Sequence, residues 1–309
     1  MRNYFKLTVL ILILFLINGC STSSALPYIN LTNESEHEDS QVIEEENAIR
    51  LGIASVISPQ ASRIGYENLV KYLEEKLQVP IIITQGETYA ETNQLIKEGK
   101  VDVALICSLA YVLGIQEDYM DGIAAPVVAG NALYRSYTIV LRNSGIDELE
   151  DLRGKKFAFT DPDSYSGRLA MLNKLSNNGE SAETFFGEIF FTYSHDYSVK
   201  SVALGIVDGA TVDSLVYDQM QEMNIEDVSN IKIIGYGEWV GTPPIVVSKF
   251  VTEDFKNEIT AILNNMHNDP KGKKVLDDLH IEKFTSIDYS TYKPIEEMII
   301  NVGEEKWLN

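Results

Sequence analysis

The sequence predicts an α/β protein with two open sheets, each covered by helices on both faces. From Ala48 onward, short apolar runs alternate with amphipathic segments of helical period. Such alternation is typical of strands and crossover helices in parallel sheets. About 260 residues follow this point, which is enough for two domains with cores of their own. We therefore expect two lobes, each an open and mostly parallel sheet flanked by helices.

The first lobe is predicted from a block of strands and helices that begins at residue 49. The run 102–107 is continuously apolar, as expected for a central parallel strand, and Gly99 ends the helix before it. The predicted strands are 49–54, 79–84 and 102–107, and the predicted helices are 61–77 and 89–97.

The second lobe is predicted from a similar block that begins near residue 136. Its predicted strands are 136–142, 156–160, 188–192, 208–212 and 231–236, and its helices are 147–152, 168–177, 198–205 and 214–223. A further strand at 245–248 and a helical C-terminal part follow. We expect the first lobe to comprise residues 49–137 and 243–309, and the second lobe residues 138–242. Ligands of open α/β sheets lie beyond the carboxyl ends of the strands, so a ligand cleft is expected between the lobes.

The N-terminal residues have the composition of an export signal. Arg2 and Lys6 precede a short apolar run that ends at Ile17, and small residues follow it. The run is shorter than the roughly 18 residues of a membrane-spanning helix. We expect residues 1–19 to form a lipoprotein signal peptide, because Ile17 to Cys20 resembles the bacterial lipobox. The alternative is an ordinary secretory signal in which the cysteine is incidental.

Cys20 is the expected lipidation site. Its acyl chains would hold the mature protein at the outer side of the membrane without a spanning helix. Residues 20–48 are predicted to be an acidic flexible tether, since residues 34–46 hold seven acidic side chains and no lysine or arginine. The expected localisation is thus extracytoplasmic, or periplasmic, and lipid-anchored.

Charge and cysteine content exclude several classes of partner and chemistry. Without Arg2 and Lys6, 23 basic residues face 46 acidic ones, a net charge of −23. This balance argues against nucleic acid and against an anionic membrane face as partners. Cys107, the second of two cysteines, lies in an apolar run and is interpreted as a small core residue. We found no catalytic motif and no zinc-ligand spacing, and expect no enzyme activity, no metal and no cofactor.

The segment 160–168 carries the strongest local signal of an anion site. A predicted strand ends at Thr160, and a helix is expected to begin near Gly167. Free N–H groups at a helix N-terminus bind anions, and the hydroxyls of Ser164 and Ser166 add uncharged donors. Ordinary helix capping by serine or aspartate is the alternative.

His195 and Asp213 follow two further predicted strands and are expected at the same edge of the sheet. The tripeptide 194–196 cannot act as a catalytic triad, because triads are assembled across space rather than along the chain. We expect His195 to donate to a ligand and Asp213 to accept a hydrogen from a protonated oxyanion. The alternative for His195 is an ordinary core or surface histidine.

Three residues of the first lobe are expected on the opposite wall of the cleft. Tyr89 starts a predicted helix, Ser108 follows the third strand, and Tyr134 precedes the crossing strand. The alternative for each tyrosine is half-buried packing with its hydroxyl in solvent, which the sixteen tyrosines of the chain make common.

Taken in order, several segments resemble the phosphate, phosphite and phosphonate-binding receptors of ABC transporters. The resemblance runs from about residue 49 to 299 and is carried by residues 66–73, 98–104, 157–164, 191–196, 205–210 and 241–247.

The resemblance implies a type II periplasmic-binding-protein fold that captures a small phosphorus oxyanion by lobe closure. In the family a Ser-Thr-Ser-Gly turn holds the oxyanion. Ser164, Ser166 and Gly167 match this turn, whereas Tyr165 replaces the threonine and leaves the ligand's identity open. The expected ligand contacts are Tyr89, Ser108, Tyr134, Ser164, Tyr165, Ser166, His195 and Asp213.

The resemblance also implies the partners of the protein. An ABC permease and its ATPase would receive the ligand from a monomeric receptor. The alternatives are a ligand-sensing lipoprotein of the same fold, a receptor for a different small solute, and a hydrolase that uses His195 and Asp213.

Overall fold

A computed structural model describes residues 47–57 and 59–303. The predicted signal peptide, Cys20 and the tether up to residue 46 lie outside the described residues. The described residues belong to one compact unit. No helix within the described ranges is both long and apolar enough to cross a membrane.

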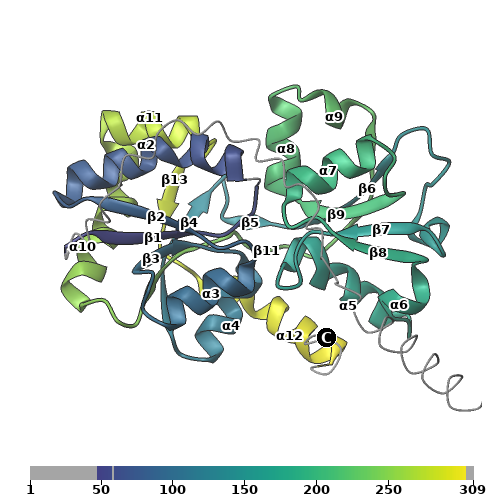
Figure 1. Ribbon diagram of the computed structural model, residues 1–309, viewed down its shortest axis with the longest axis horizontal. Helices are drawn as coiled ribbons and strands as arrows, with labels where there is room; N and C mark the ends of the chain where they lie inside the picture. Colours follow the sequence, from purple (N-terminus) through teal and green to yellow (C-terminus); the bar gives the residue numbers. More distant parts are fainter. Residues whose placement is uncertain (1–46, 58, 304–309) are drawn as a thin grey trace, which may run out of the picture. The chain divides into compact units, whose positions relative to one another are not determined.

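The first sheet has six strands in the order β13-β4-β12-β3-β1-β2. Helices α2 and α11 lie on one of its faces, and α3 and α4 on the other (Figure 1). Its strands are β1 (Ile49–Ile53), β2 (Ile81–Gln85), β3 (Val103–Leu105), β4 (Met120–Val127), β12 (Ile245–Ser248) and β13 (Lys283–Thr285). Its helices are α2 (Pro59–Leu77), α3 (Tyr89–Lys97), α4 (Ser108–Gln116), α10 (Glu253–Asn265) and α11 (Pro270–Asp278), with the 3₁₀ turn η3 (Met266–Asn268).

The second sheet has five strands in the order β10-β6-β9-β7-β8. Its strands are β6 (Ser136–Leu141), β7 (Lys156–Phe159), β8 (Glu188–Phe191), β9 (Gly209–Asp213) and β10 (Ile231–Tyr236). Around it lie η1 (Leu149–Leu152), the π-helical turn η2 (Tyr165–Leu169), α5 (Ala170–Asn177), α6 (Ala182–Phe185), α7 (His195–Ala203), α8 (Ser214–Glu222) and α9 (Glu226–Ser229).

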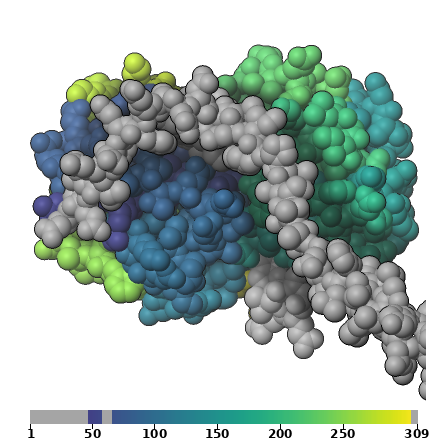
Figure 2. All heavy atoms as spheres, in the orientation of Figure 1, coloured from purple at the N-terminus to yellow at the C-terminus, as the bar shows by residue number. Residues whose placement is uncertain are grey.

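A small third sheet and the C-terminal helix complete the described part. Strands β5 (Leu133–Tyr134) and β11 (Val240–Gly241) pair antiparallel next to the two crossings between the large sheets. After η4 (Tyr289–Tyr292), helix α12 (Lys293–Val302) packs against α5, and Asn301 donates to Asn173 at 2.7 Å. The C-terminal helix thus contacts an element of the second block. In Figure 2 the residues of the first block are purple and blue, and residues 200–240 are green.

Both sheets are mixed, with four of six strands in the first and four of five in the second running in one direction, in line with the mostly parallel sheets expected. In the first sheet β1 pairs parallel with β2 and β3, whereas β12 and β4 run antiparallel to their neighbours. In the second sheet β7 pairs parallel with β8 and β9, and β6 runs antiparallel to β9 and β10. Strands β6 and β12, which are the first strands of the large sheets after the two crossings, run against the βαβ units of their sheets, as does β13.

Among the elements that escaped prediction, helix α4 and strand β4 did so for an identifiable reason. Helix α4 and strand β4 are buried along most of their length, and Ser108 to Val112 are all buried. A helix that is apolar all round carries no periodic signal. Helix α7 begins at His195, three residues before its predicted start.

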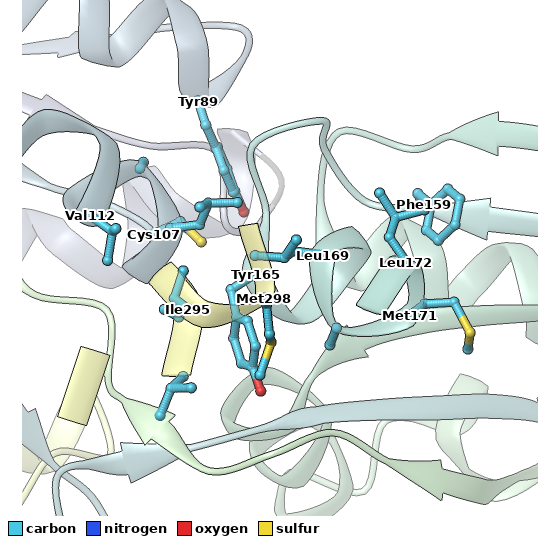
Figure 3. Close-up of a cluster of buried hydrophobic side chains, with 14 of the residues drawn as sticks. Tyr89, Cys107, Val112, Phe159, Tyr165, Leu169, Met171, Leu172, Ile295 and Met298 are labelled. Carbon is cyan, nitrogen blue, oxygen red and sulfur yellow. The ribbon is translucent and has the colours of Figure 1, made fainter. Parts of the chain in front are cut away.

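Three clusters of buried side chains hold the described elements together. One belongs to the first sheet and includes Leu51 and Leu263, and another belongs to the second sheet and includes Ile139 and Val199. The third contains residues of both blocks, among them Tyr89, Tyr165 and the other side chains drawn in Figure 3. The two lobes therefore share a core at the place where the chain crosses between them.

Gly241 of β11 is predicted to tolerate no side chain. A Cβ built there would overlap the ring of Tyr292, which lies close to the backbone, whereas a Cβ at Gly235 would meet Thr138 at 3.3 Å. We expect Gly241→Ala to lower the free energy of unfolding by about 1–3 kcal/mol. Urea denaturation measures the loss, with Gly235→Ala as the matched control. Equal stability of the two variants would contradict this account of the crossing.

Candidate functional site

The predicted site residues stand where strands give way to helices. Tyr89, Ser108 and His195 are the first residues of α3, α4 and α7. Asp213 caps α8, and Tyr134 ends β5. Each of these side chains is at most 2% exposed. The C-terminal edges of both sheets thus bring together helix N-termini, which favour negative charge.

The turn formed by residues 164–167, called the serine turn below, is held in shape by hydrogen bonds within the segment 164–169. The Ser164 hydroxyl oxygen accepts the N–H of Gly167 at 2.9 Å, and the Leu169 N–H donates to the Ser164 carbonyl at 3.0 Å. A Cβ at Gly167 would lie 2.5 Å from that of Thr160, so only glycine fits this close approach. The Ser164 hydroxyl hydrogen is left to donate to a ligand. The Ser166 hydroxyl is buried and has no partner among the described residues.

The hydrogen bonds of His195 fix which of its ring nitrogens carries the proton. The backbone N–H of Asp213 donates to Nδ1 at 3.0 Å, and the Thr160 hydroxyl lies 3.0 Å from the same atom. Burial lowers the pKa of His195 to about 3, so the ring is neutral at physiological pH. Since Nδ1 is an acceptor, the proton resides on Nε2. His195 is therefore an uncharged donor at this place.

Asp213 combines a capping role with a perturbed carboxyl group. Its Oδ1 accepts the N–H groups of Leu215 at 2.6 Å and Val216 at 3.3 Å. Burial raises the pKa of Asp213 to about 7, although both N–H groups oppose the rise. Near neutral pH this carboxyl exists in both protonation states. It can thus accept a hydrogen from a ligand or donate one to it.

Four buried hydroxyls near these groups have no hydrogen-bond partner within the described ranges. They belong to Tyr89, Tyr134, Ser166 and Ser194. Leaving a buried donor unpaired costs about 1–3 kcal/mol, and native structures rarely accept several such costs in one place. The chemistry that matches these donors is a compact acceptor with several oxygens.

Two of the predicted contact side chains already have partners inside the protein. The Ser108 hydroxyl donates to the Gly241 carbonyl at 2.7 Å. The Tyr165 hydroxyl donates to the Glu238 carbonyl, and its ring packs edge-on against that of Tyr134, with centroids 5.7 Å apart. Their hydroxyl hydrogens are thus engaged, and Tyr165 contributes to the shared core shown in Figure 3.

A cavity of about 620 Å³ opens beside Asp213, between elements of the two lobes. Tyr66 of α2 lines it from the first lobe and Trp239 from the second. Burial, and next the charge of Asp213, raise the pKa of Tyr66 to about 12. Tyr66 is a site residue that the sequence did not reveal, because nothing in the pattern of α2 separates it from a packing tyrosine. The carboxylates that line the cavity are Asp213, Asp218, Glu222, Asp277 and Glu282.

Two backbone hydrogen bonds join the lobes next to the site. The Tyr89 N–H donates to the Asp161 carboxylate at 3.1 Å, and the His195 N–H donates to the Val56 carbonyl at 2.9 Å. Burial raises the pKa of Asp161 to about 6, and the N–H groups of Asp163 and Tyr89 counter part of this rise. Each lobe therefore contacts the other through residues adjoining the predicted ligand contacts.

Comparison with known proteins supplies the family. Residues 51–292 match the family described as ABC transporter, phosphonate, periplasmic substrate-binding protein. The chain belongs to this family. Members are substrate-binding components of importers that act outside the cytoplasm, and not enzymes. The phosphonates-binding periplasmic protein of Escherichia coli is 27% identical over 277 residues, covering 86% of this chain and 81% of that one.

Solved structures agree with the assignment of the fold. A phosphonate-transporter binding protein from Pseudomonas aeruginosa superposes with a TM-score of 0.78 at 24% identity, covering 85% of this chain and 92% of that one. The PhnD1 protein of Prochlorococcus marinus, solved with methylphosphonate, gives 0.75 at 19% identity over 84% and 99% of the two chains. The two-lobed type II periplasmic-binding-protein fold expected from the sequence is confirmed.

Removing an unpaired hydroxyl is predicted to stabilise the protein. Tyr134→Phe deletes a buried donor that has no partner, so the free energy of unfolding of the ligand-free protein should rise by about 1 kcal/mol. Tyr292→Phe is the matched control, because the Tyr292 hydroxyl donates to the Thr242 carbonyl at 2.7 Å and its loss should destabilise. Denaturant melts measure both. A loss of stability in Tyr134→Phe would show that its hydroxyl is already satisfied.

Asp213→Asn is predicted to change how stability depends on pH. The pKa of Asp213 rises from an ordinary 3.8 to about 7 on folding, so the folded state holds a proton that the unfolded state releases. This group's contribution to the free energy of unfolding therefore falls as the pH rises from about 4 to 7.

Asparagine has no such proton, so the free energy of unfolding of the variant does not change with pH through this group. The difference in free energy of unfolding, variant minus natural protein, should therefore increase by about 1 kcal/mol or more between pH 4 and pH 8. Thermal melts over this range measure the difference, with the exposed Asp254→Asn as control. A difference that stays constant with pH would contradict the raised pKa.

Proposed function

We propose that this protein is an extracytoplasmic lipoprotein that captures a small phosphorus oxyanion for an ABC importer by closure of its lobes. The observation that carries the proposal is the group of buried, unpaired hydroxyls next to Asp213 and His195. They provide donors from both lobes for the oxygens of one small anion. The proposed ligand contacts are Tyr89, Tyr134, Ser164, Ser166, His195 and Asp213, with Ser108 and Tyr165 shaping the walls.

The proposed mode of binding uses no lysine or arginine. Hydroxyl groups, the Nε2–H of His195 and backbone N–H groups at helix starts donate to an anion in a site removed from water. Asp213 completes the site by sharing one proton with the ligand. A protonated Asp213 donates to a dianion, and an ionised Asp213 accepts from a monoanion. The complex then holds the same total charge in either form.

Closure follows from the placement of donors on both lobes. Tyr89 and Tyr134 belong to the first wall, and the serine turn with His195 to the second. A ligand that bonds to both walls binds the closed state more tightly than the open one, so it shifts the population towards closure. The proposed lobes are residues 49–137 with 243–309, and 138–242. The closed form would deliver the ligand to a permease and its ATPase.

Relatives support a phosphorus ligand but differ in which one their names give. The Mycolicibacterium smegmatis relative is named a phosphate-import protein, and the Prochlorococcus marinus relative a probable phosphite-binding protein. The Escherichia coli relative is named for phosphonates. A phosphonate, phosphite or phosphate is therefore the proposed ligand class. Lipidation at Cys20, after removal of residues 1–19, and a monomeric state are part of the same proposal.

One observation favours a phosphonate that also carries an amine. Five carboxylates, that of Asp213 included, line the cavity, and among the described residues no lysine or arginine does so. Tyr66 adds an aromatic face, which attracts organic cations, whereas the ring of Trp239 already carries the Arg135 guanidinium at 4.5 Å. A second candidate ligand is thus 2-aminoethylphosphonate, with its phosphonate at the hydroxyls and its ammonium in the acidic cavity.

Isothermal calorimetry tests the proposal directly. The protein is titrated with phosphite, methylphosphonate, 2-aminoethylphosphonate, phosphate and sulfate. We expect micromolar or tighter binding of a phosphorus ligand, weakened at least tenfold by Tyr89→Phe or Tyr134→Phe because each removes a charge-assisted hydrogen bond. Tyr292→Phe is the matched control and should bind normally. The absence of heat with every phosphorus ligand would overturn the oxyanion assignment.

A further inference from the structure

Cys107 stands at the start of α4, on the same side of the first lobe as the buried phenol of Tyr89 (Figure 3). It follows strand β3 and occupies the N-cap position of α4, but its side chain makes no capping hydrogen bond. It is 3% exposed. In the close-up of the shared core, the ring of Tyr89 extends from α3 towards the Cys107 sulfur (Figure 3).

The groups that surround the thiol belong to both walls of the proposed site. Burial raises the pKa of Tyr89 and of Tyr134 well above the usual value of a phenol, and Cys107 is the ionisable group that next most opposes the ionisation of each. The pKa of Cys107 is itself raised to about 11 by burial, while the backbone N–H groups of Tyr165 and Leu109 act in the opposite direction. Leu109 lies in the first lobe and Tyr165 in the second. The sulfur therefore lies near Tyr89, whose fully buried phenol has no hydrogen-bond partner among the described residues.

A thiol contributes differently to such a site than a hydroxyl does. It is a weak donor and behaves mainly as a small apolar group. The hydroxyls of Tyr89, Tyr134 and Ser166, which have no partner among the described residues, can supply strong donors for oxygens. An apolar surface among strong donors fits an anion in which one substituent on phosphorus is a hydrogen or a carbon.

We infer that Cys107 is a specificity-determining residue that contacts the non-oxygen substituent of the ligand, and so selects phosphonate or phosphite over phosphate. The inference rests on the proposed capture of a phosphorus oxyanion. A fourth oxygen placed against the thiol would lose its hydrogen bonds to water and gain only a weak donor. That loss disfavours phosphate relative to methylphosphonate.

The test is the ratio of dissociation constants for phosphate and methylphosphonate, measured by calorimetry on the full-length protein. We expect the natural protein to prefer methylphosphonate. Cys107→Ser places a strong donor at the same point and should shift the ratio roughly tenfold towards phosphate. Cys107→Ala keeps an apolar surface and should leave the ratio within about twofold, which makes it the matched control. A ratio is insensitive to a general loss of folded protein, so a merely structural role of Cys107 would not change it.

The outcomes separate this inference from the proposed function. Binding of methylphosphonate with an unchanged ratio in Cys107→Ser would overturn the role of Cys107 and leave the proposed function intact. A natural protein that binds phosphate more tightly than methylphosphonate would also overturn the role of Cys107 and leave the proposed function intact. A protein that binds none of the phosphorus ligands would overturn both.

Discussion

Buried donors without partners impose the central constraint on this protein. Each of the four unpaired hydroxyls costs about 1–3 kcal/mol, and the rest of the fold must supply that free energy. The shared core provides the rigidity, because Tyr165 and its neighbours hold the walls in place through contacts that a ligand does not need to form. Binding energy can then come from satisfying groups that are already positioned, at little further cost in conformational entropy.

The proposed recognition of an anion by a strongly acidic protein rests on the same arrangement. The formal net charge of −21 gives no long-range attraction for a negative ligand. Attraction must arise locally, from backbone N–H groups at helix starts, from uncharged hydroxyls and from a neutral histidine. These donors bring no full positive charge into the site, so the protein avoids the cost of burying an unpaired cation. Asp213 fits into this neutral site because its raised pKa lets it carry a proton when the ligand does not.

The crossings between the lobes connect the site to the fold. Ser108, the first residue of α4, donates to the carbonyl of Gly241 in β11, where the chain returns to the first lobe. The Tyr292 hydroxyl donates to the carbonyl of the next residue, Thr242. Tyr134 of the proposed site lies where the chain passes from the first lobe to the second. Two residues later, the hydroxyl of Ser136 donates to the carbonyl of Ser166 in the serine turn. The crossings are thus joined by hydrogen bonds to residues of the proposed site or to their chain neighbours.

Much of this organisation follows from the sequence. The alternation of strands and helices determined the fold class, and the places where strands end before Ser164, His195 and Asp213 determined which residues meet at the carboxyl edge of the second sheet. These features are local, since a period of hydrophobicity or a turn is encoded by neighbouring residues. Helix α4 and strand β4 could not be predicted in this way, because burial on all sides removes the periodic pattern.

Only the tertiary structure decided the state of each side chain. The sequence contains sixteen tyrosines, and nothing in its pattern separates the unpaired hydroxyls of Tyr89 and Tyr134 from the bonded hydroxyls of Tyr165 and Tyr292. The tautomer of His195 and the raised pKa of Asp213 likewise depend on burial and on partners far away in the chain. Hydrogen bonding and desolvation are set by three-dimensional neighbours, so the sequence determines which groups are available and the fold determines what they can bind.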